Sequence, residues 1–152
     1  MPNLKQIKGR NDVSQELIVG VWGLVAQMYE DVDSGERVPI FGDAPRGRQI
    51  ATKDGRWLAL ATGGGRSAPT TEAEHVTAMR SMIAYTGRYR VEGDKVTTKV
   101  EAAWNESWVG GEQVRYLRFE TDDLLHIVSA PMPHPNLPGR KVRVVVTWAR
   151  EE

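Results

Sequence analysis

Two tyrosines and one histidine are the side chains of this sequence best suited to proton transfer. Tyr85 and Tyr89 are four residues apart in a run with the alternation of a β-strand, which puts both phenols on one face. His126 lies in a second such run, where it alternates with Leu124 and Val128. A neutral imidazole beside a phenol can move a proton on a bound carbonyl compound by general acid-base catalysis. His126 and Tyr85 are therefore the candidate catalytic residues.

Other catalytic machinery is scarce in the sequence. The chain has no cysteine, so thiolate metal sites and cysteine nucleophiles are excluded, and its three histidines have no spacing that suits a metal site. The run Gly63-Gly64-Gly65-Arg66 lacks the glycine spacing and the lysine of a phosphate-binding loop. No serine nucleophile elbow or dinucleotide-binding fingerprint is present. We expect no metal and no cofactor.

Aromatic side chains on predicted inner strand faces indicate an apolar binding pocket. They are Trp57, Tyr85, Tyr89 and Trp104. Small residues on the same strands would leave volume between these rings, namely Ala59, Ala61, Gly87 and Ala102. An apolar, aromatic pocket with a few hydroxyl groups is typical of a site for a hydrophobic ligand. The alternative is that the rings fill the interior as core.

The run 113–120 is amphipathic on both faces, so alternation alone leaves its orientation open. Arg115 lies on one face and Tyr116 on the other. An inward Arg115 would be a buried cation that needs a carboxylate or an aromatic partner, whereas an outward one would form surface salt bridges. Both residues join the candidate ligand-binding residues.

Turn residues divide the chain into eight predicted strands with antiparallel connections. The strands are predicted over residues 19–29, 47–52, 56–62, 85–91, 95–103, 113–120, 124–129 and 140–148. Tight turns are indicated by Asp54-Gly55, by Gly93 between two acidic residues, and by Asp122-Asp123. Residues 38–41 contain a proline and are predicted to be an edge piece or a loop.

One short helix is predicted between the third and fourth strands, over residues 71–84. Thr71 and Glu74 have the spacing of a capping box at its start. Apolar residues then recur at helical spacing, and they include Met79 and Ile83. We expect this helix to cover the open end of a barrel, with Met79 and Ile83 against the ligand. The alternative is that it packs on the outside.

Composition narrows the class of protein and of partner. A chain of 152 residues with 40% hydrophobic content fits one domain, which we assign to residues 17–152 after a flexible tail at 1–16. The 20 basic and 20 acidic residues are interspersed, which excludes the charge pattern of nucleic-acid binding. No apolar run has the length of a membrane helix. We expect a soluble cytoplasmic protein, monomeric or homodimeric, whose partner is a small hydrophobic molecule.

A Gly-x-Trp motif opens the first predicted strand. It is part of the run Gly20-Val21-Trp22, where the glycine allows close chain approach and the indole can plug the end of a barrel. Three further groups follow in order: Phe41-Gly42 with Pro45 and Gly47; residues 83–89; and Trp108-Val109-Gly110 with Gln113-Val114-Arg115. This ordered set, over residues 17–150, resembles the bacterial and fungal lipocalin-like domain family.

The resemblance implies an all-β fold, namely an eight-stranded antiparallel up-and-down β-barrel of the calycin type. Lipocalins commonly stack an arginine on the Gly-x-Trp ring, and Arg115, Arg140 and Arg143 are candidates for that place on Trp22. An eight-stranded barrel can be filled by side chains or can hold one small ligand. Residues and resemblance together favour binding of a small hydrophobic molecule, aromatic or polyketide-like. The alternative is a cofactor-free isomerase, cyclase or lyase that uses the same pocket.

Overall fold

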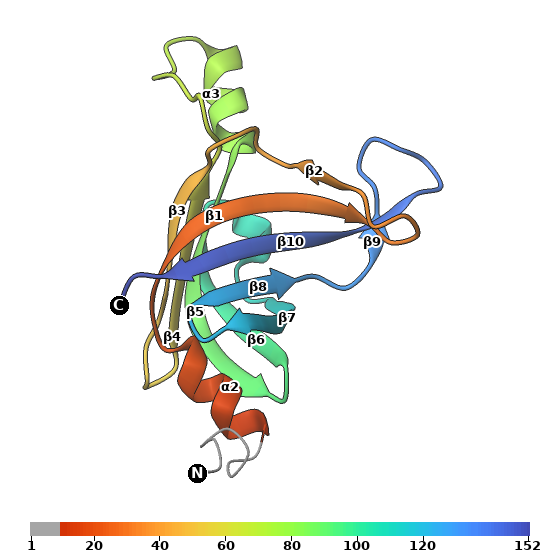
Figure 1. The fold of residues 1–152 in the computed structure, drawn as a ribbon. Coiled ribbons are helices and arrows are strands. Elements are labelled where there is room, and N and C mark those ends of the chain that lie inside the picture. The colour runs from red at the N-terminus through yellow and green to blue at the C-terminus, as the bar shows by residue number, and fades with distance from the viewer. Residues whose placement is uncertain (1–9) are drawn as a thin grey trace.

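The computed structural model describes residues 10–152, and the strands form one closed barrel (Figure 1). Eight antiparallel strands follow one another in chain order, and pairing of the last with the first closes the ring. They are β1 (Gly20–Asp31), β3 (Arg46–Ala51), β4 (Arg56–Thr62), β5 (Met82–Glu92), β6 (Lys95–Ala103), β7 (Glu112–Thr121), β8 (Leu124–Val128) and β10 (Lys141–Arg150). Two short strands, β2 (Arg37–Pro39) and β9 (Met132–Pro133), pair with β1 and β10. The predicted eight-stranded up-and-down barrel is confirmed.

Glycine-containing turns set the register of the hairpins. Gly55 and Gly93 have φ angles of 91° and 67°, in the left-handed region that glycine enters without steric cost. Because side chains alternate along a strand, a fixed register decides which residues face the interior. On β4, Trp57 is buried, whereas Leu58 and Leu60 are 42% and 43% exposed. The face that carries Trp57 and the small alanines is therefore the inner one.

Trp22 closes one end of the barrel. Its side chain is fully buried, and its indole N–H donates to the Ile18 carbonyl at 2.9 Å. Ile18 is the last residue of helix α2 (Arg10–Ile18), and its side chain is also fully buried. Residues 10–16, which we assigned to the tail, lie in the helix that brings Ile18 to Trp22. Residues 1–9 lie outside the described residues.

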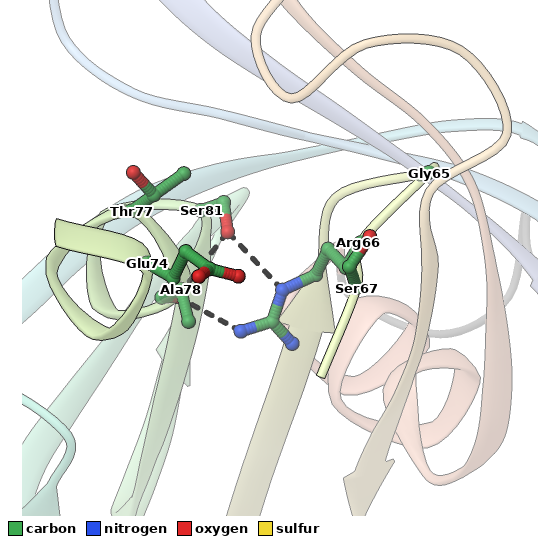
Figure 2. A pocket seen from close by; sticks show the side chains of 8 residues that line it. Gly65, Arg66, Ser67, Glu74, Thr77, Ala78 and Ser81 are labelled. Atoms are coloured by element: carbon green, nitrogen blue, oxygen red, sulfur yellow. Dashed lines mark hydrogen bonds between the residues drawn. The ribbon is translucent and has the colours of Figure 1, made fainter. Parts of the chain in front are cut away.

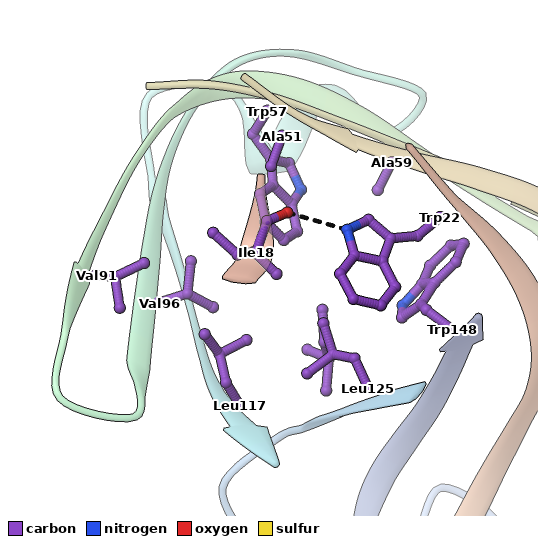
Figure 3. Packing of buried hydrophobic residues seen from close by; sticks show 11 residues of the cluster. Ile18, Trp22, Ala51, Trp57, Ala59, Val91, Val96, Leu117, Leu125 and Trp148 are labelled. Carbon is purple, nitrogen blue, oxygen red and sulfur yellow. Dashed lines mark hydrogen bonds between the residues drawn. The ribbon is translucent and has the colours of Figure 1, made fainter. Parts of the chain in front are cut away.

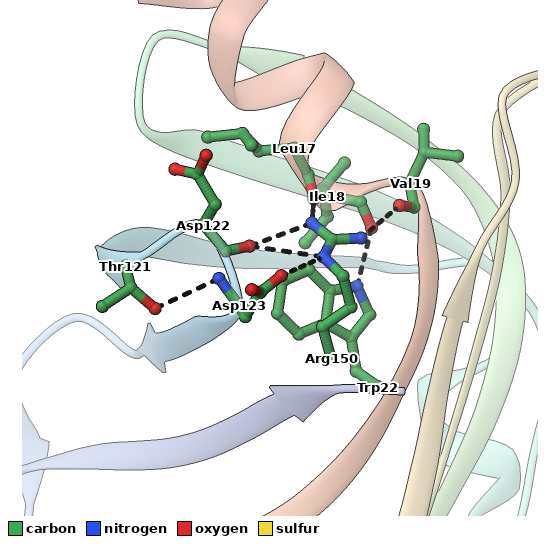
Figure 4. Close-up of polar contacts among 8 residues, drawn as sticks. All are labelled: Leu17, Ile18, Val19, Trp22, Thr121, Asp122, Asp123 and Arg150. Carbon is green, nitrogen blue, oxygen red and sulfur yellow. Dashed lines mark hydrogen bonds and ion pairs between the residues drawn. The ribbon is translucent and has the colours of Figure 1, made fainter. Parts of the chain in front are cut away.

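Arg150 holds this closed end together. Its guanidinium lies over the Trp22 ring, 4.2 Å from the centroid. It donates to the Val19 carbonyl at 2.9 Å, to the Leu17 carbonyl at 2.5 Å and to the Asp122 carbonyl at 3.1 Å (Figure 4). One side chain thus joins the end of α2, the residue before β1 and the turn between β7 and β8.

The predicted stack of an arginine on Trp22 is confirmed, but the candidate residues Arg115, Arg140 and Arg143 are wrong. The predicted last strand ended at residue 148, whereas β10 continues to Arg150. These two extra residues place Arg150 directly opposite Trp22 in the β1–β10 ladder. The strand end, not the strand interior, supplies the cation.

Buried side chains fill the barrel next to Trp22 (Figure 3). The cluster contains Ile18, Trp22, Ala51, Trp57, Ala59, Val91, Val96, Leu117, Leu125, Ile127 and Trp148. It draws residues from α2 and from every barrel strand. The end of the barrel beside α2 is therefore packed, and any interior space lies farther toward the opposite end.

Helix α3 (Glu72–Arg80) is not the predicted lid. Its start is as predicted, because the Thr71 hydroxyl accepts a hydrogen bond from the Glu74 amide at 3.2 Å. The helix has no buried residue, and Val76 and Met79 are 47% and 45% exposed. It also ends at Arg80, because the chain enters β5 at Met82. The apolar stripe faces solvent, so the lid prediction is wrong.

A β-bulge on β6 removes Trp104 from the inner face. Thr86 pairs with Ala102 but Gly87 pairs with Val100, so Glu101 is an extra residue in the ladder. Alternation predicts Ala102 and Trp104 on the inner face with Val100, whereas Glu101 and Ala102 are both exposed. The bulge is possible because Gly87 has no Cβ, which would collide with the Lys99 carbonyl. Residues after the bulge therefore face the opposite side of the sheet from the one that alternation predicts.

Candidate ligand-binding site

A cavity of about 80 Å³ lies inside the barrel and is partly open to solvent. Its wall is mostly apolar and comes from β1, β3, β4, β5, β7, β8, β10 and the short helix η1 (Glu106–Trp108). The lining residues are Gln27, Gln49, Trp57, Ala59, Ala61, Ile83, Tyr85, Trp108, Arg115, Ile127, Val144, Val146 and Trp148. Because the core cluster fills the end beside α2, the cavity opens away from that helix.

Two deeply buried nitrogen atoms on the cavity wall have no hydrogen-bond partner. They are Nε2 of Gln49 and Nε1 of Trp57, on side chains that are 1% and 3% exposed. A buried N–H group without a partner costs about 1–3 kcal/mol, so such groups are rare in folded proteins. Both nitrogens belong to side chains that line the cavity.

Arg115 brings a positive charge to the opposite wall. β3 and β7 are four places apart in the closed order of eight strands, so Gln49 and Arg115 face each other across the interior. Arg115 donates to the Val114 carbonyl at 2.8 Å and to Oε1 of Gln113 at 3.0 Å. These bonds use two of the five N–H groups of a guanidinium. No carboxylate whose side chain the structure describes forms an ion pair with Arg115.

The Tyr85 phenol is the hydroxyl group of the cavity. Burial raises the pKa of Tyr85, and the opposing influences of the Arg115 charge and of the nearby Trp57 indole are smaller. The indole N–H approaches the phenol without completing a hydrogen bond to it. At neutral pH the phenol is therefore protonated and can donate to an acceptor.

The structure brings four of the predicted site residues together and separates the others. Trp57, Ile83, Tyr85 and Arg115 line the cavity, with Ile83 on β5 instead of on a helix. The predicted residues that do not line it are Met79, Tyr89, Trp104, Tyr116 and His126. Met79 is half exposed on α3, and Tyr116 is 36% exposed on the outer face of β7. Trp104 lies beyond β6 and reaches the site only through Trp108, at 4.8 Å between ring centroids.

His126 faces away from the cavity. Its neighbours Leu125 and Ile127 point inward, so alternation along β8 puts the imidazole on the outer face. Nδ1 lies 2.9 Å from Oγ1 of Thr147, and Nε2 lies 2.7 Å from a Glu120 carboxylate oxygen. The imidazole is held by these outer partners, so His126 and Tyr85 do not form one catalytic site.

Tyr89 does not line the cavity, and its hydroxyl makes a hydrogen bond within the fold. Its ring is 5.7 Å from that of Trp57, and its hydroxyl donates to the Thr52 carbonyl at 2.6 Å. That carbonyl also accepts the Gly55 amide in the β3–β4 turn. The phenol thus ties β5 to the turn, and it is not free to bind a ligand.

We expect Tyr89→Phe to lower the free energy of unfolding by about 0.5–1.5 kcal/mol, the usual worth of one hydrogen bond. Ligand affinity should stay the same, because the lost hydroxyl does not reach the cavity. Urea unfolding measures the first quantity, and Tyr116→Phe on the outer face is the matched control, with an expected change within about 0.5 kcal/mol. A change in affinity without a change in stability would instead place Tyr89 in the binding site.

Several lining residues were not predicted from the sequence. Gln49 lies between Gly47 and Ala51 at strand spacing, so alternation on β3 was a usable signal for it. Gln27 had the same signal on β1. Trp108 had none, because it belongs to a loop helix and meets the Tyr85 ring at 5.4 Å only through the folding of that loop. The periodicity of strands does not predict where a loop packs in the folded protein.

A larger hollow of about 330 Å³ lies outside the barrel, between α3 and the loop after β4 (Figure 2). Its polar groups bond one another. Arg66 donates to the Ala78 carbonyl at 2.8 Å and to the Ser81 hydroxyl at 3.1 Å, which caps the end of α3. Most of the lining is exposed. This hollow has no buried unpartnered group of the kind that marks the barrel cavity.

Comparison with protein-family models now identifies the fold family. The model described as a lipocalin-like domain matches residues 19–151. The chain belongs to the lipocalin-like domain family. Comparison with curated proteins finds no match. The family model covers all eight barrel strands, so the lipocalin-like domain includes the whole cavity wall.

Two further findings concern metal binding and membrane-spanning helices. Among the residues that the structure describes, no group of three or more histidine, aspartate and glutamate side chains is placed to hold a metal ion. The helices within residues 10–152 are too short or too polar to cross a membrane.

Proposed function

We propose that this lipocalin-like barrel binds one small hydrophobic molecule in its interior. The observation that carries the proposal is the cavity lined by Trp57, Tyr85 and Trp108, together with aliphatic side chains of β4, β8 and β10. Apolar walls with a few placed polar groups are the usual composition of a small-molecule site. Family membership supports the proposal, because an eight-stranded barrel has room for one small ligand.

The size of the cavity limits how the ligand sits. A volume of about 80 Å³ is close to half of the roughly 150 Å³ cavity that takes up benzene in an engineered protein. One ring or one chain end enters, and side chains at the open side adjust around it. An aromatic or polyketide-like ligand would extend from there past Trp108, which lines the cavity, toward Trp104, whose ring packs against that of Trp108.

Binding is favoured over the enzymatic alternative by the position of the candidate catalytic groups. A cofactor-free isomerase, cyclase or lyase would use His126 and Tyr85 together. His126 bonds to Glu120 and Thr147 on the outer face, so Tyr85 alone of the two adjoins a ligand in the cavity.

Toluene is a suitable probe, because it carries one ring and no polar group. Titration with toluene should change the tryptophan fluorescence in a saturable manner with one site per chain, since Trp57, Trp108 and Trp148 line the cavity. Absence of a saturable change up to the solubility of toluene would mean that the interior is packed shut, and the proposal would fail.

A further inference from the structure

Two donors on the wall of the proposed binding cavity, Nε2 of Gln49 and Nε1 of Trp57, have no hydrogen-bond partner. The indole N–H of Trp57 has no partner, and an indole offers only a donor. Arg115 likewise has only donors, and its bonds to the Val114 carbonyl and Gln113 Oε1 leave part of the guanidinium unused. A hydrophobic molecule without oxygen would cover these groups without bonding them.

The donor residues come from four strands and line the same cavity. In the strand ladders Gln49 pairs with Ala59, and Ala59 pairs with Tyr85, so the methyl group of Ala59 separates the amide from the phenol. Trp57 precedes Ala59 by two residues and faces the same side. Arg115 approaches from β7 and is close enough to Tyr85 to lower its pKa. These four residues therefore surround the same interior space of about 80 Å³.

The charge of Arg115 decides which oxygen group fits best. A neutral carbonyl could accept two hydrogen bonds but would leave the cation uncompensated in apolar surroundings. A carboxylate offers about four lone-pair sites and a negative charge, so it can accept from several donors and neutralise the guanidinium. The rest of the cavity wall is apolar, and the hydrocarbon part of the same molecule would pack against it.

We propose that the ligand is a small hydrophobic carboxylate whose carboxyl group enters the cavity and accepts hydrogen bonds from Arg115, Trp57 and Tyr85. This inference rests on the proposed function. Gln49 supplies a fourth donor through Nε2. Arg115 thereby acts as the residue that selects carboxylates over uncharged molecules of the same shape.

Benzoate and benzamide form a matched pair of probes, because they have the same shape and differ in charge. We expect benzoate to bind the unmodified protein at least about tenfold more tightly than benzamide, in proportion to the worth of a partly buried charge pair. Toluene should compete with benzoate for the same site. All three affinities can be measured by competition in the tryptophan fluorescence titration at neutral pH.

Two variants assign the preference to residues. Arg115→Gln should lower benzoate affinity about tenfold or more and leave benzamide affinity within about twofold. Arg118→Gln, three residues along β7 and exposed, is the control and should change neither. Trp57→Phe removes one N–H and should weaken benzoate and benzamide by about two- to tenfold while sparing toluene. Urea midpoints verify that each variant folds. If Arg115→Gln does not fold, the benzoate-to-benzamide affinity ratio of the unmodified protein still tests the carboxylate preference, and Trp57→Phe tests whether the polar group of the probe lies beside the indole.

The possible failures are distinct. Equal affinities for benzoate, benzamide and toluene would overturn the carboxylate preference but leave the binding function intact. If Arg118→Gln abolished the preference for benzoate and Arg115→Gln preserved it, benzoate would bind at the outer surface. That result would also overturn the inference. Failure of all three probes to bind would overturn the binding function itself.

Discussion

Trp22→Ala is expected to lower the free energy of unfolding by about 3–5 kcal/mol, the cost of truncating a large aromatic side chain in a core. Trp22 is fully buried at the end of the barrel, where its ring contacts Arg150 and its N–H bonds to Ile18. Alanine would leave a void between α2 and the strands, and the Ile18 carbonyl would lose its partner. Urea unfolding measures the change.

Two variants bracket this result. Val25→Ala removes a side chain that is 52% exposed on the same strand, so its effect should stay within about 0.5 kcal/mol. Trp22→Phe keeps a ring under Arg150 but removes the hydrogen bond to Ile18, and should fall between the two. A loss below about 1 kcal/mol for Trp22→Ala would show that the indole does not support the closed end.

Ala59→Leu is expected to lower the affinity for toluene at least about tenfold, because the larger side chain would occupy the middle of an interior of only about 80 Å³. Ala59 is 8% exposed and lies between Gln49 and Tyr85 on the cavity wall. Filling a cavity leaves stability unchanged or raises it when the side chain fits, and overpacking lowers it by about 1–3 kcal/mol. Fluorescence titration gives the affinity, and urea unfolding separates the two cases.

Ala102→Leu is the matched control, since it makes the same substitution on the exposed side of the β6 bulge. It should leave toluene affinity unchanged. Equal affinity in the Ala59→Leu variant and the unmodified protein would move the binding site out of the barrel interior.

The fold could be predicted from the sequence because turns and alternation are local signals. Gly55 and Gly93 occupy the turns they indicate, and the face with Trp57 and Tyr85 is the inner one. Lipocalin-like family membership adds closure of the barrel, which no local pattern encodes. The stacking of an arginine on the Trp22 ring was also predicted from this resemblance, but the arginine is Arg150.

The errors have specific physical causes. One extra residue at Glu101 reverses the alternation on β6, so Trp104 leaves the inner face. The helix ends at Arg80 because β5 begins at Met82, so Met79 is exposed and Ile83 lines the cavity from a strand. Strand periodicity contains no information about a bulge or about where a short helix lies relative to a barrel.

His126 shows a different limit of sequence patterns. Alternation correctly separates it from its neighbours Leu125 and Ile127, but the sequence does not say which of the two faces is the inner one. Val128, on the face of His126, is buried like Leu125 and Ile127, so burial alone does not identify the inner face, whereas the cavity lining does. The candidate proton-transfer residue therefore lies on the outer side of the barrel wall.

The indole N–H signals in a ¹H–¹⁵N NMR spectrum test the central claim, that a hydrophobic molecule binds inside the barrel. Trp57 lines the cavity and its Nε1 has no partner, whereas Trp22 Nε1 is bonded to Ile18 in the packed end. During titration with toluene, the Trp57 signal should shift in a saturable manner with one site per chain, and the Trp22 signal should stay in place. A Trp57 signal that does not move throughout the titration would contradict binding in the cavity.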